Sequence, residues 1–241
     1  MFLKLASRTA AIVTLGSLND TADSKMKSKS SSHNMSSESS SLIYSIAFIA
    51  SGDGDQQFAG YALGINALLS DQRDAVSQYV MAHKGDDGSA GRWLLQVNEG
   101  LYTISFVSSA HGGDLQFKGW SLGVNALPKD KRDAMSQYVM AHSDVSGCDG
   151  KWAIEALADG THAISFIRSA HGGDKQFAGW GLGIKALPMD TRDSGSQFVM
   201  AHGNHDCAGR WMLVPVEHDN GECEGQLQRS RPDSRTFDGQ H

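Results

Sequence analysis

Apolar and polar residues alternate over short stretches of this chain, and no stretch keeps the 3.6-residue period of an amphipathic helix. The clearest alternation runs through Tyr102, Ile104 and Phe106, with Thr103 and Ser105 between them. A period of two is typical of a strand with one buried face. The segment HGGD that follows predicts a turn, because its adjacent glycines adopt positive φ angles at little cost. The pattern therefore indicates an all-β fold.

Three more strands are expected before this pattern starts again. Residues 116–127 are predicted to form the second strand, in which Gly119 and Gly123 indicate a bulge or a close backbone contact. Alternating apolar residues predict a third strand over 138–142 and a fourth over 152–156. Each such stretch is thus predicted to hold four short strands.

The same stretch occurs three times in tandem. Its copies begin YSIAFIASGDGDQQFAG, YTISFVSSAHGGDLQFKG and AISFIRSAHGGDKQFAG, and they end in GRWLLQV, GKWAIEA and GRWMLVP. A repeat of this kind cannot bury its apolar face alone, so neighbouring copies must share a core. We therefore expect a single all-β domain over residues 41–218, built from three tandem four-stranded repeats.

The junctions between copies resemble those of a known superfamily. A Trp strand is followed by a turn and then by a strand that reads Tyr-x-Ile or His-x-Ile, as in Trp152, Asp159-Gly160 and His162-Ala163-Ile164. Three four-stranded copies with such junctions resemble the β-trefoil superfamily, with its ricin-B-like lectins and fascin-like proteins, over about residues 42–217. Where ricin-B-type lectins carry Gln-x-Trp, this chain has Gly-x-Trp. The resemblance implies a β-trefoil, and a β-prism, also built of three four-stranded units, is the alternative fold.

Charge and hydropathy restrict the partners. The 241 residues carry a formal net charge of −6, and Lys and Arg form no cluster. A general nucleic-acid binder presents a basic face to the phosphate backbone, so nucleic acid is not an expected partner. No run of 18 apolar residues is present, and no membrane span is expected.

Motifs of enzymes and metal sites are missing from the sequence. It contains no G-x-S-x-G, H-E-x-x-H or P-loop pattern. The spacing of His202, His205 and Cys207 suits zinc, but no fourth ligand is evident. Three equal active sites in one small domain would be unusual for an enzyme, whereas repeated binding sites gain avidity. We therefore expect a protein that is not an enzyme and that carries no cofactor or metal.

The two ends of the chain differ from the repeats. Residues 1–40 are rich in serine and hold little that could be buried, which predicts a disordered tail. Residues 219–241 are polar and predict a second tail. A short apolar run at 9–18, preceded by Lys4 and Arg8, suits either a weak secretory signal or a mitochondrial-type presequence. The compartment therefore remains open.

Two repeated features are interpreted as structural. The pattern Asp-x-Arg-Asp occurs at 71–74, 130–133 and 190–193, and an Arg fork between carboxylates can order a loop. In each copy a histidine is the last of the residues of the third strand that are predicted to face inward. A core residue with satisfied hydrogen bonds is expected at this position. These histidines are His83, His142 and His202.

The turn after the first strand is the best candidate for a ligand site. In each copy an Asp is followed at fixed offsets by a Gln and an aromatic residue. The predicted ligand-binding residues are Asp55, Gln57, Tyr61, Asp114, Gln116, Trp120, Asp174, Gln176 and Trp180. A carboxylate and an amide can hold sugar hydroxyls, and an aromatic ring can stack on the C–H face of a sugar. The alternative is that the Asp caps its turn and the ring belongs partly to the core.

The repeated residues of the three copies lead to two hypotheses on function. The first is a multivalent carbohydrate-binding, lectin-like module with one site per repeat, whose partners are glycans or glycoproteins. The second is a protein-binding module of the cytoskeletal or protease-inhibitor type. The triplicated Asp, Gln and aromatic set favours the first.

Overall fold

The structure is a computed structural model, and it describes residues 42–52, 55–65, 72–85, 88–124, 127–143, 146–184 and 191–216. The tails predicted at 1–40 and 219–241 lie outside these ranges. Within these ranges, no helix is long and apolar enough to cross a membrane.

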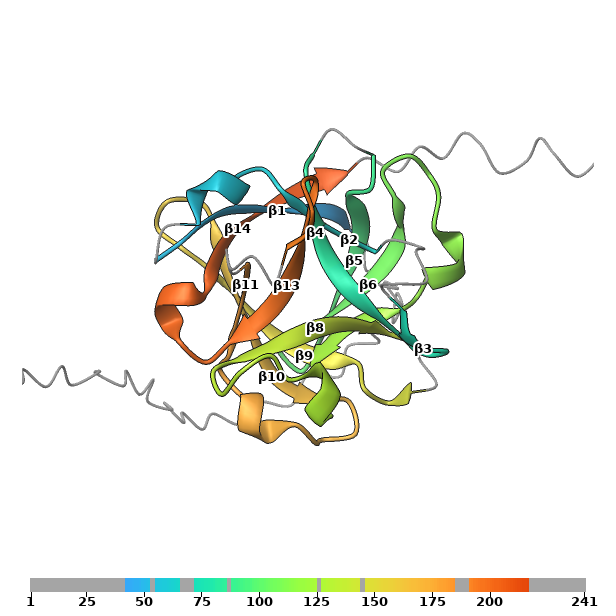
Figure 1. Cartoon of the computed structure of the whole chain (residues 1–241), viewed down its shortest axis with the longest axis vertical. Helices are drawn as coiled ribbons and strands as arrows, with labels where there is room; N and C mark the ends of the chain where they lie inside the picture. The colour runs from blue at the N-terminus through green and yellow to red at the C-terminus, as the bar shows by residue number, and fades with distance from the viewer. Residues whose placement is uncertain are drawn as a thin grey trace, which may run out of the picture. The chain divides into compact units, whose positions relative to one another are not determined.

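The described residues are folded into strands and short 3-10 helices, without an α-helix, so the all-β prediction is confirmed (Figure 1). The strands are β1 (Ile43–Ser51), β2 (Ala62–Ile65), β3 (Gln72–Asp74), β4 (Ser77–His83), β5 (Gly91–Asn98), β6 (Leu101–Ser109), β7 (Ser121–Val124), β8 (Ser136–His142), β9 (Gly150–Ala156), β10 (His162–Ser169), β11 (Gly181–Ile184), β12 (Thr191–Asp193), β13 (Ser196–His202) and β14 (Gly209–Val216). The 3-10 helices are η1 (Gln56–Phe58), η3 (Leu115–Phe117), η4 (Pro128–Asp130), η6 (Lys175–Phe177) and η8 (His205–Cys207).

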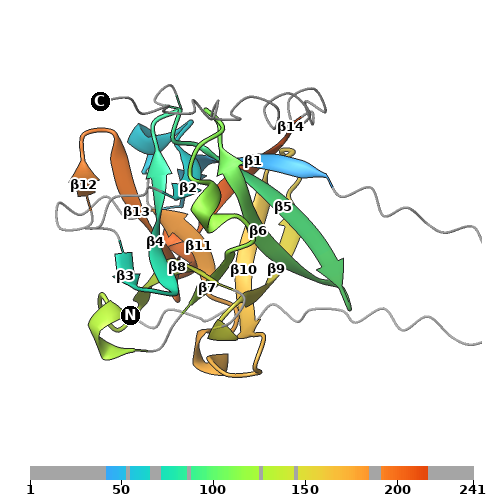
Figure 2. The ribbon, with the colours of Figure 1, turned by 90° about the vertical axis from the view of Figure 1, so that its right-hand side faces the viewer.

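All fourteen strands belong to one antiparallel sheet, which closes on itself as a β-barrel. One ring of pairings runs β1–β5–β6–β9–β10–β14 and returns from β14 to β1. The short strands β2, β7 and β11 connect this ring to β4, β8 and β13, which pair with one another. Figure 2 shows the two groups side by side, with the ring strands on the right and β4, β8 and β13 on the left.

The predicted fold class needs correction. Three tandem four-stranded units, arranged as a β-trefoil or as a β-prism, were expected, but the fourteen strands form one continuous sheet. Strands of different copies pair directly, as in β1 with β14 and β4 with β8. The count per copy also differs, because the Asp-x-Arg-Asp segments of the first and third copies add the short strands β3 and β12. In the second copy the corresponding segment makes only one bridge, between Lys131 and Gln137.

The second strand of each copy is shorter than predicted. In place of one strand over 116–127, the second copy has the helix η3 and then β7. Gly119 has a φ angle of 86°, which ends the helix and would interrupt a strand. Gly123 lies within β7, where a Cβ atom would come 2.3 Å from the carbonyl oxygen of Cys148 and 2.8 Å from the His142 ring. The predicted close backbone contact at Gly123 is therefore confirmed.

The core is built from the residues that alternate along the strands. The indoles of Trp93, Trp152 and Trp211 are fully buried, and each ring meets a phenylalanine edge to face. Each indole N–H donates a hydrogen bond to the carbonyl oxygen of a leucine in the neighbouring short strand, at 2.9–3.1 Å. The rings thus fill the barrel without leaving a buried donor unpaired.

The predicted histidines join one copy to another. The Nδ1 atoms of His83, His142 and His202 lie 3.2, 3.0 and 3.2 Å from serine Oγ atoms of another copy. These serines are Ser196, Ser77 and Ser136. All three imidazole rings are buried, so the prediction that they belong to the core is confirmed, but the expected satisfaction of their hydrogen bonds is not, since Nε2 of His142 has no partner among the described residues.

Candidate functional site

The turns after β1, β6 and β10 share one backbone arrangement. In each, a 3-10 helix is followed by a glycine whose N–H donates to the carbonyl oxygen of the phenylalanine in the preceding strand, at 2.7–2.8 Å. The N–H of that phenylalanine donates to the carbonyl oxygen of the aromatic residue that ends the turn, at 2.7–2.9 Å. These paired bonds fix the aromatic residue over the strand in all three copies.

The entry into the turn differs in the first copy. Asp114 and Asp174 have positive φ angles of 59° and 57°, a left-handed conformation that Asp adopts more readily than most residues. Asp55 has a φ angle of −67°. The first copy is one residue shorter before this turn, so its chain reaches the 3-10 helix by another path.

Two of the three aspartates stabilise their own turns. The hydroxyl of Ser51 donates to Asp55 at 3.2 Å, and the hydroxyl of Ser169 donates to Asp174 at 2.5 Å. Asp55 is buried, and Asp174 is half-buried with His171 at 4.0 Å from its carboxylate. At these two positions the geometry agrees with the alternative interpretation, in which Asp orders the turn.

The glutamines and the aromatic rings differ in exposure. Gln57, Gln116 and Gln176 lie in the middle of their 3-10 helices, and all three side chains are exposed. The aromatic residues at the ends of the turns are half-buried and pack against the core. Their rings meet those of the phenylalanines in the 3-10 helices edge to face, with centroids 4.8–5.3 Å apart. These aromatic residues are Tyr61, Trp120 and Trp180.

Two of these aromatic residues lie where two copies meet. The Tyr61 hydroxyl lies 3.5 Å from the carbonyl oxygen of Ser194 in the third copy. A Cβ atom at Gly203 would lie 2.9 Å from the Trp180 ring and 3.0 Å from the methyl group of Met135 in the second copy. Beside Met135 is a pocket of about 330 Å³, whose wall includes Asn204. Sequence reasoning missed these junctions, because they join residues far apart in the chain.

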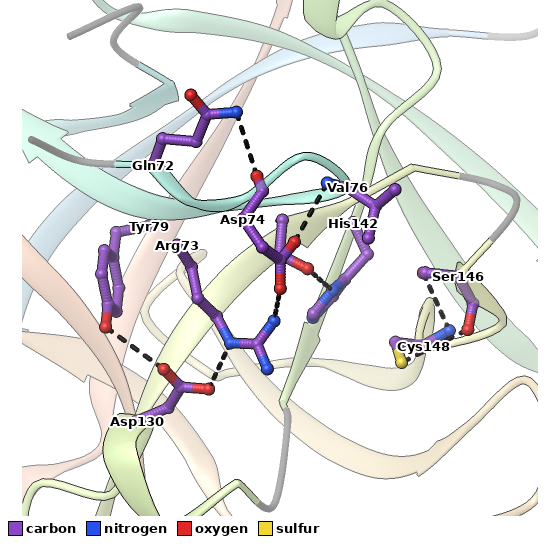
Figure 3. A network of polar contacts seen from close by, with 10 residues as sticks. Gln72, Arg73, Asp74, Val76, Tyr79, Asp130, His142, Ser146 and Cys148 are labelled. Carbon is purple, nitrogen blue, oxygen red and sulfur yellow. Dashed lines mark hydrogen bonds and ion pairs between the residues drawn. The ribbon is translucent and has the colours of Figure 1, made fainter. Parts of the chain in front are cut away.

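A second polar cluster lies between the first and second copies (Figure 3). The Arg73 guanidinium is paired with Asp74 beside it and with Asp130, whose Oδ2 lies 2.6 Å from Nε. The Tyr79 hydroxyl donates to the other oxygen of Asp130 at 3.2 Å. Burial, and then the charge of Asp130, raise the pKa of Tyr79 to about 12. Arg73 thus lies between two carboxylates as predicted, but one of them, Asp130, comes from the second copy, where it was expected to pair with Arg132.

The corresponding positions Asp71 and Asp190 lie outside the described residues. Among the described residues, no group of three or more His, Cys, Asp or Glu side chains could hold a metal ion. The thiol of Cys148 forms no disulfide among the described residues, the sulfur of Cys207 accepts from the side-chain amide of Asn204 at 3.6 Å, and Cys223 lies outside the described ranges.

The burial of His142 predicts a loss of stability in acid. Burial first, and then the charge of Arg73, lower the pKa of His142 from 6.5 to about 4. The folded state thus favours the neutral ring, and its contribution is complete above pH 6.5 and lost as the pH falls towards 4. We expect a loss of about 2 kcal/mol by pH 5 and about 3 kcal/mol in all. Urea unfolding of the wild type and of His142→Gln between pH 7.5 and pH 4 measures this loss, and equal pH dependence in both would contradict it.

Comparison with known proteins gives no family. No protein-family model and no curated protein matches the chain. Solved structures that align with this chain include an exo-β-1,3-galactanase from Clostridium thermocellum, with 18% identity and a TM-score of 0.44 over 73% of this chain and 30% of that one. The double-headed arrowhead protease inhibitor A, solved with two trypsins, has 11% identity and a TM-score of 0.47 over 74% and 91%. A salivary protein of Culex has 14% identity and a TM-score of 0.45 over 73% and 94%. Similarities at this level identify no ligand.

Proposed function

We propose that this protein is a non-catalytic, multivalent carbohydrate-binding module whose three repeated turns each form one shallow site. The observation that carries the proposal is the repetition of one turn geometry, with an exposed glutamine and a half-buried aromatic ring at the same place in every copy. Its partners are glycans or glycoproteins.

In this proposal the side chains of each turn make different contacts with the sugar. An exposed glutamine offers an amide donor and an acceptor that match vicinal sugar hydroxyls. The exposed part of the Tyr61, Trp120 or Trp180 ring offers an apolar surface for a sugar ring. The aspartates of the predicted set serve in this proposal to fix the turn, because Asp55 and Asp174 are engaged by serines.

Three weak sites on one chain suit a multivalent ligand. When a branched glycan or a glycoprotein engages one turn, its next sugar reaches a second turn at a high effective concentration. Avidity then exceeds the affinity of a single shallow site without any further contact. The protein needs no cofactor for this function.

The glutamines give the cleanest test, because they are exposed and do not pack in the core. We expect the full chain to bind glycans on an array. We expect Gln57→Ala, Gln116→Ala and Gln176→Ala together to lower the apparent affinity at least about tenfold, as each loses a hydrogen bond. The melting temperature should stay within about 6 °C of the wild type, because three surface substitutions of at most about 0.5 kcal/mol each change the stability by no more than about 1.5 kcal/mol.

A matched control comes from the same chain. Gln96 is exposed on β5, away from the turns, and Gln96→Ala should bind as the wild type does. Unchanged glycan binding in the folded triple variant would remove the turns as sites. A wild type that binds no glycan would favour the protein-binding alternative.

A further inference from the structure

The three turns differ in the residue that lies beside their aromatic ring. The short strand after each turn begins opposite the core histidine of its copy. The residue that follows the histidine therefore lies beside the aromatic residue that ends the turn. This residue is Lys84 in the first copy, Ser143 in the second and Gly203 in the third. Only the ring of the third copy, Trp180, thus lies against a residue without a side chain.

The missing side chain at Gly203 brings Trp180 close to a loop of the second copy. Strands β8 and β13 pair at this junction (Figure 1), and the N–H of Gly203 donates to the carbonyl oxygen of Met135 at 2.8 Å. A Cβ atom at Gly203 would come within 2.9 Å of the Trp180 ring and 3.0 Å of the Met135 methyl group. The ring and the methyl group therefore fill the space that a side chain at this position would need.

Met135 also lines the pocket at this junction. The pocket has a volume of about 330 Å³, within the range of small-molecule sites. Met135 is 49% exposed, so its side chain offers an open apolar surface that joins the Trp180 ring to the pocket. Two copies supply the lining, which consists of Asp133, Ala134, Met135, Ser136, Asn204 and Cys207.

Two accessible polar side chains of this pocket are held in place by the protein itself. The Asp133 side chain is 32% exposed, with Oδ1 accepting from the N–H of Met135 at 2.8 Å and Oδ2 paired with Arg132. Asn204 is exposed, and its Oδ1 accepts from the backbone of η8 at 3.2 Å. A carboxylate oxygen can accept a further hydrogen bond, and the amide nitrogen of Asn204 carries two N–H groups. A ligand in the pocket thus meets an acceptor and a donor that are already oriented.

This combination suits a neutral sugar. Its hydroxyl groups can donate to the carboxylate of Asp133 and accept from the amide of Asn204. Its C–H face can lie on the thioether of Met135, which adapts to irregular surfaces. An acidic sugar would bring a second negative charge next to Asp133, and like charges in a partly buried site repel.

We propose that the third turn and this pocket together bind a neutral disaccharide, with one sugar on Trp180 and the next between Asp133 and Asn204. The first two turns, where Lys84 and Ser143 lie beside the rings, each bind a single sugar unit. This inference rests on the proposed carbohydrate function, because the first sugar occupies the third turn.

Matched pairs of soluble sugars test the inference on the full chain. The pairs are glucose and cellobiose, galactose and galactobiose, mannose and mannobiose, and N-acetylglucosamine and chitobiose. We expect at least one disaccharide to bind the third turn about tenfold more tightly than its monosaccharide, as for one additional good hydrogen bond. The first two turns should bind both members of the pair with equal affinity.

NMR titration separates the turns from the pocket. Either sugar of the binding pair should shift the side-chain amide signals of Gln57, Gln116 and Gln176. Only the disaccharide should also shift the side-chain amide signals of Asn204 and the methyl signal of Met135.

Two variants remove the contacts of the second sugar. Asn204→Ser keeps an oxygen that can cap η8 but removes the amide donor, so the third turn should bind the disaccharide only as tightly as the monosaccharide. Met135→Ala should lower the affinity for the disaccharide in the same way and leaves the cap of η8 in place. Asn98→Ser, at the exposed end of β5, is the matched control and should bind both sugars as the wild type does.

The outcomes distinguish this inference from the function on which it rests. If no sugar shifts any of the three glutamine signals, the carbohydrate function is wrong, and the disaccharide site with it. If those signals shift but no disaccharide binds the third turn more tightly than its monosaccharide, only the disaccharide site is wrong. Unchanged Asn204 and Met135 signals, or a disaccharide preference that persists in both variants, would overturn it as well.

Discussion

Replacing Trp152 by alanine is expected to lower the free energy of unfolding by about 3–5 kcal/mol, as for other fully buried aromatic residues. The ring is fully buried, meets Phe166 edge to face at 5.3 Å, and donates a hydrogen bond to the carbonyl oxygen of Leu122. The substitution leaves a cavity in the barrel and an acceptor without its donor. Urea unfolding at pH 7 measures the change.

Trp180→Ala is the matched control for this experiment. Trp180 is also packed against a phenylalanine, but it is only half-buried at the end of its turn. We therefore expect it to be less destabilising than Trp152→Ala. A loss below about 1 kcal/mol for Trp152→Ala would contradict the burial of the ring.

Replacing Asp130 by asparagine is the second large effect, with an expected loss of about 3–5 kcal/mol. Asp130 is fully buried, and its two oxygens hold the Arg73 guanidinium and the Tyr79 hydroxyl. Without the carboxylate, the Arg73 charge keeps Asp74, whose side chain is 36% exposed, as a counter-charge, but it loses its buried partner in a site where its own side chain is only 7% exposed. Breaking one side of a buried ion pair costs more than the pair itself contributes, because the partner charge stays desolvated.

Two further variants test this explanation. Arg73→Met combined with Asp130→Leu should recover much of the lost stability, because no charge then remains buried. Asp159 pairs with Arg210 at 2.8 Å on the surface, and Asp159→Asn should change the stability little. If Asp130→Asn behaves like Asp159→Asn in thermal unfolding, the buried pair is not a major source of stability.

The strands could be predicted because their pattern is local. The alternation through Tyr102, Ile104 and Phe106 lies within one strand, and β6 contains all three residues. Because the pattern recurs in each copy, it also predicted that equivalent residues would be buried to the same degree. The three fully buried tryptophans are an example.

What the sequence did not reveal depends on contacts between copies. Asp130 was assigned to a polar loop, but Arg73, which is 57 residues away in sequence, makes its burial possible. The division into three four-stranded units was wrong because hydrophobic periodicity does not specify which strands pair across copies.

In the turns, too, the sequence predicted what depends on nearby residues and not what depends on distant ones. Their Asp, Gln and aromatic residues were found by spacing alone, and the structure gives Asp55 and Asp174 a local partner each. The exposure of Gln57, Gln116 and Gln176 could not be read from spacing, since it depends on how the 3-10 helices lie on the barrel.

The central claim is that each of the three turns binds carbohydrate, and counting bound ligands tests it most directly. The oligosaccharide that binds best on a glycan array is titrated into the full chain and observed by native mass spectrometry. We predict complexes with one, two and three oligosaccharides at increasing concentration. Each of the substitutions Gln57→Ala, Gln116→Ala and Gln176→Ala should lower the largest number of bound oligosaccharides by one. A single bound oligosaccharide that persists in the triple variant would contradict the claim.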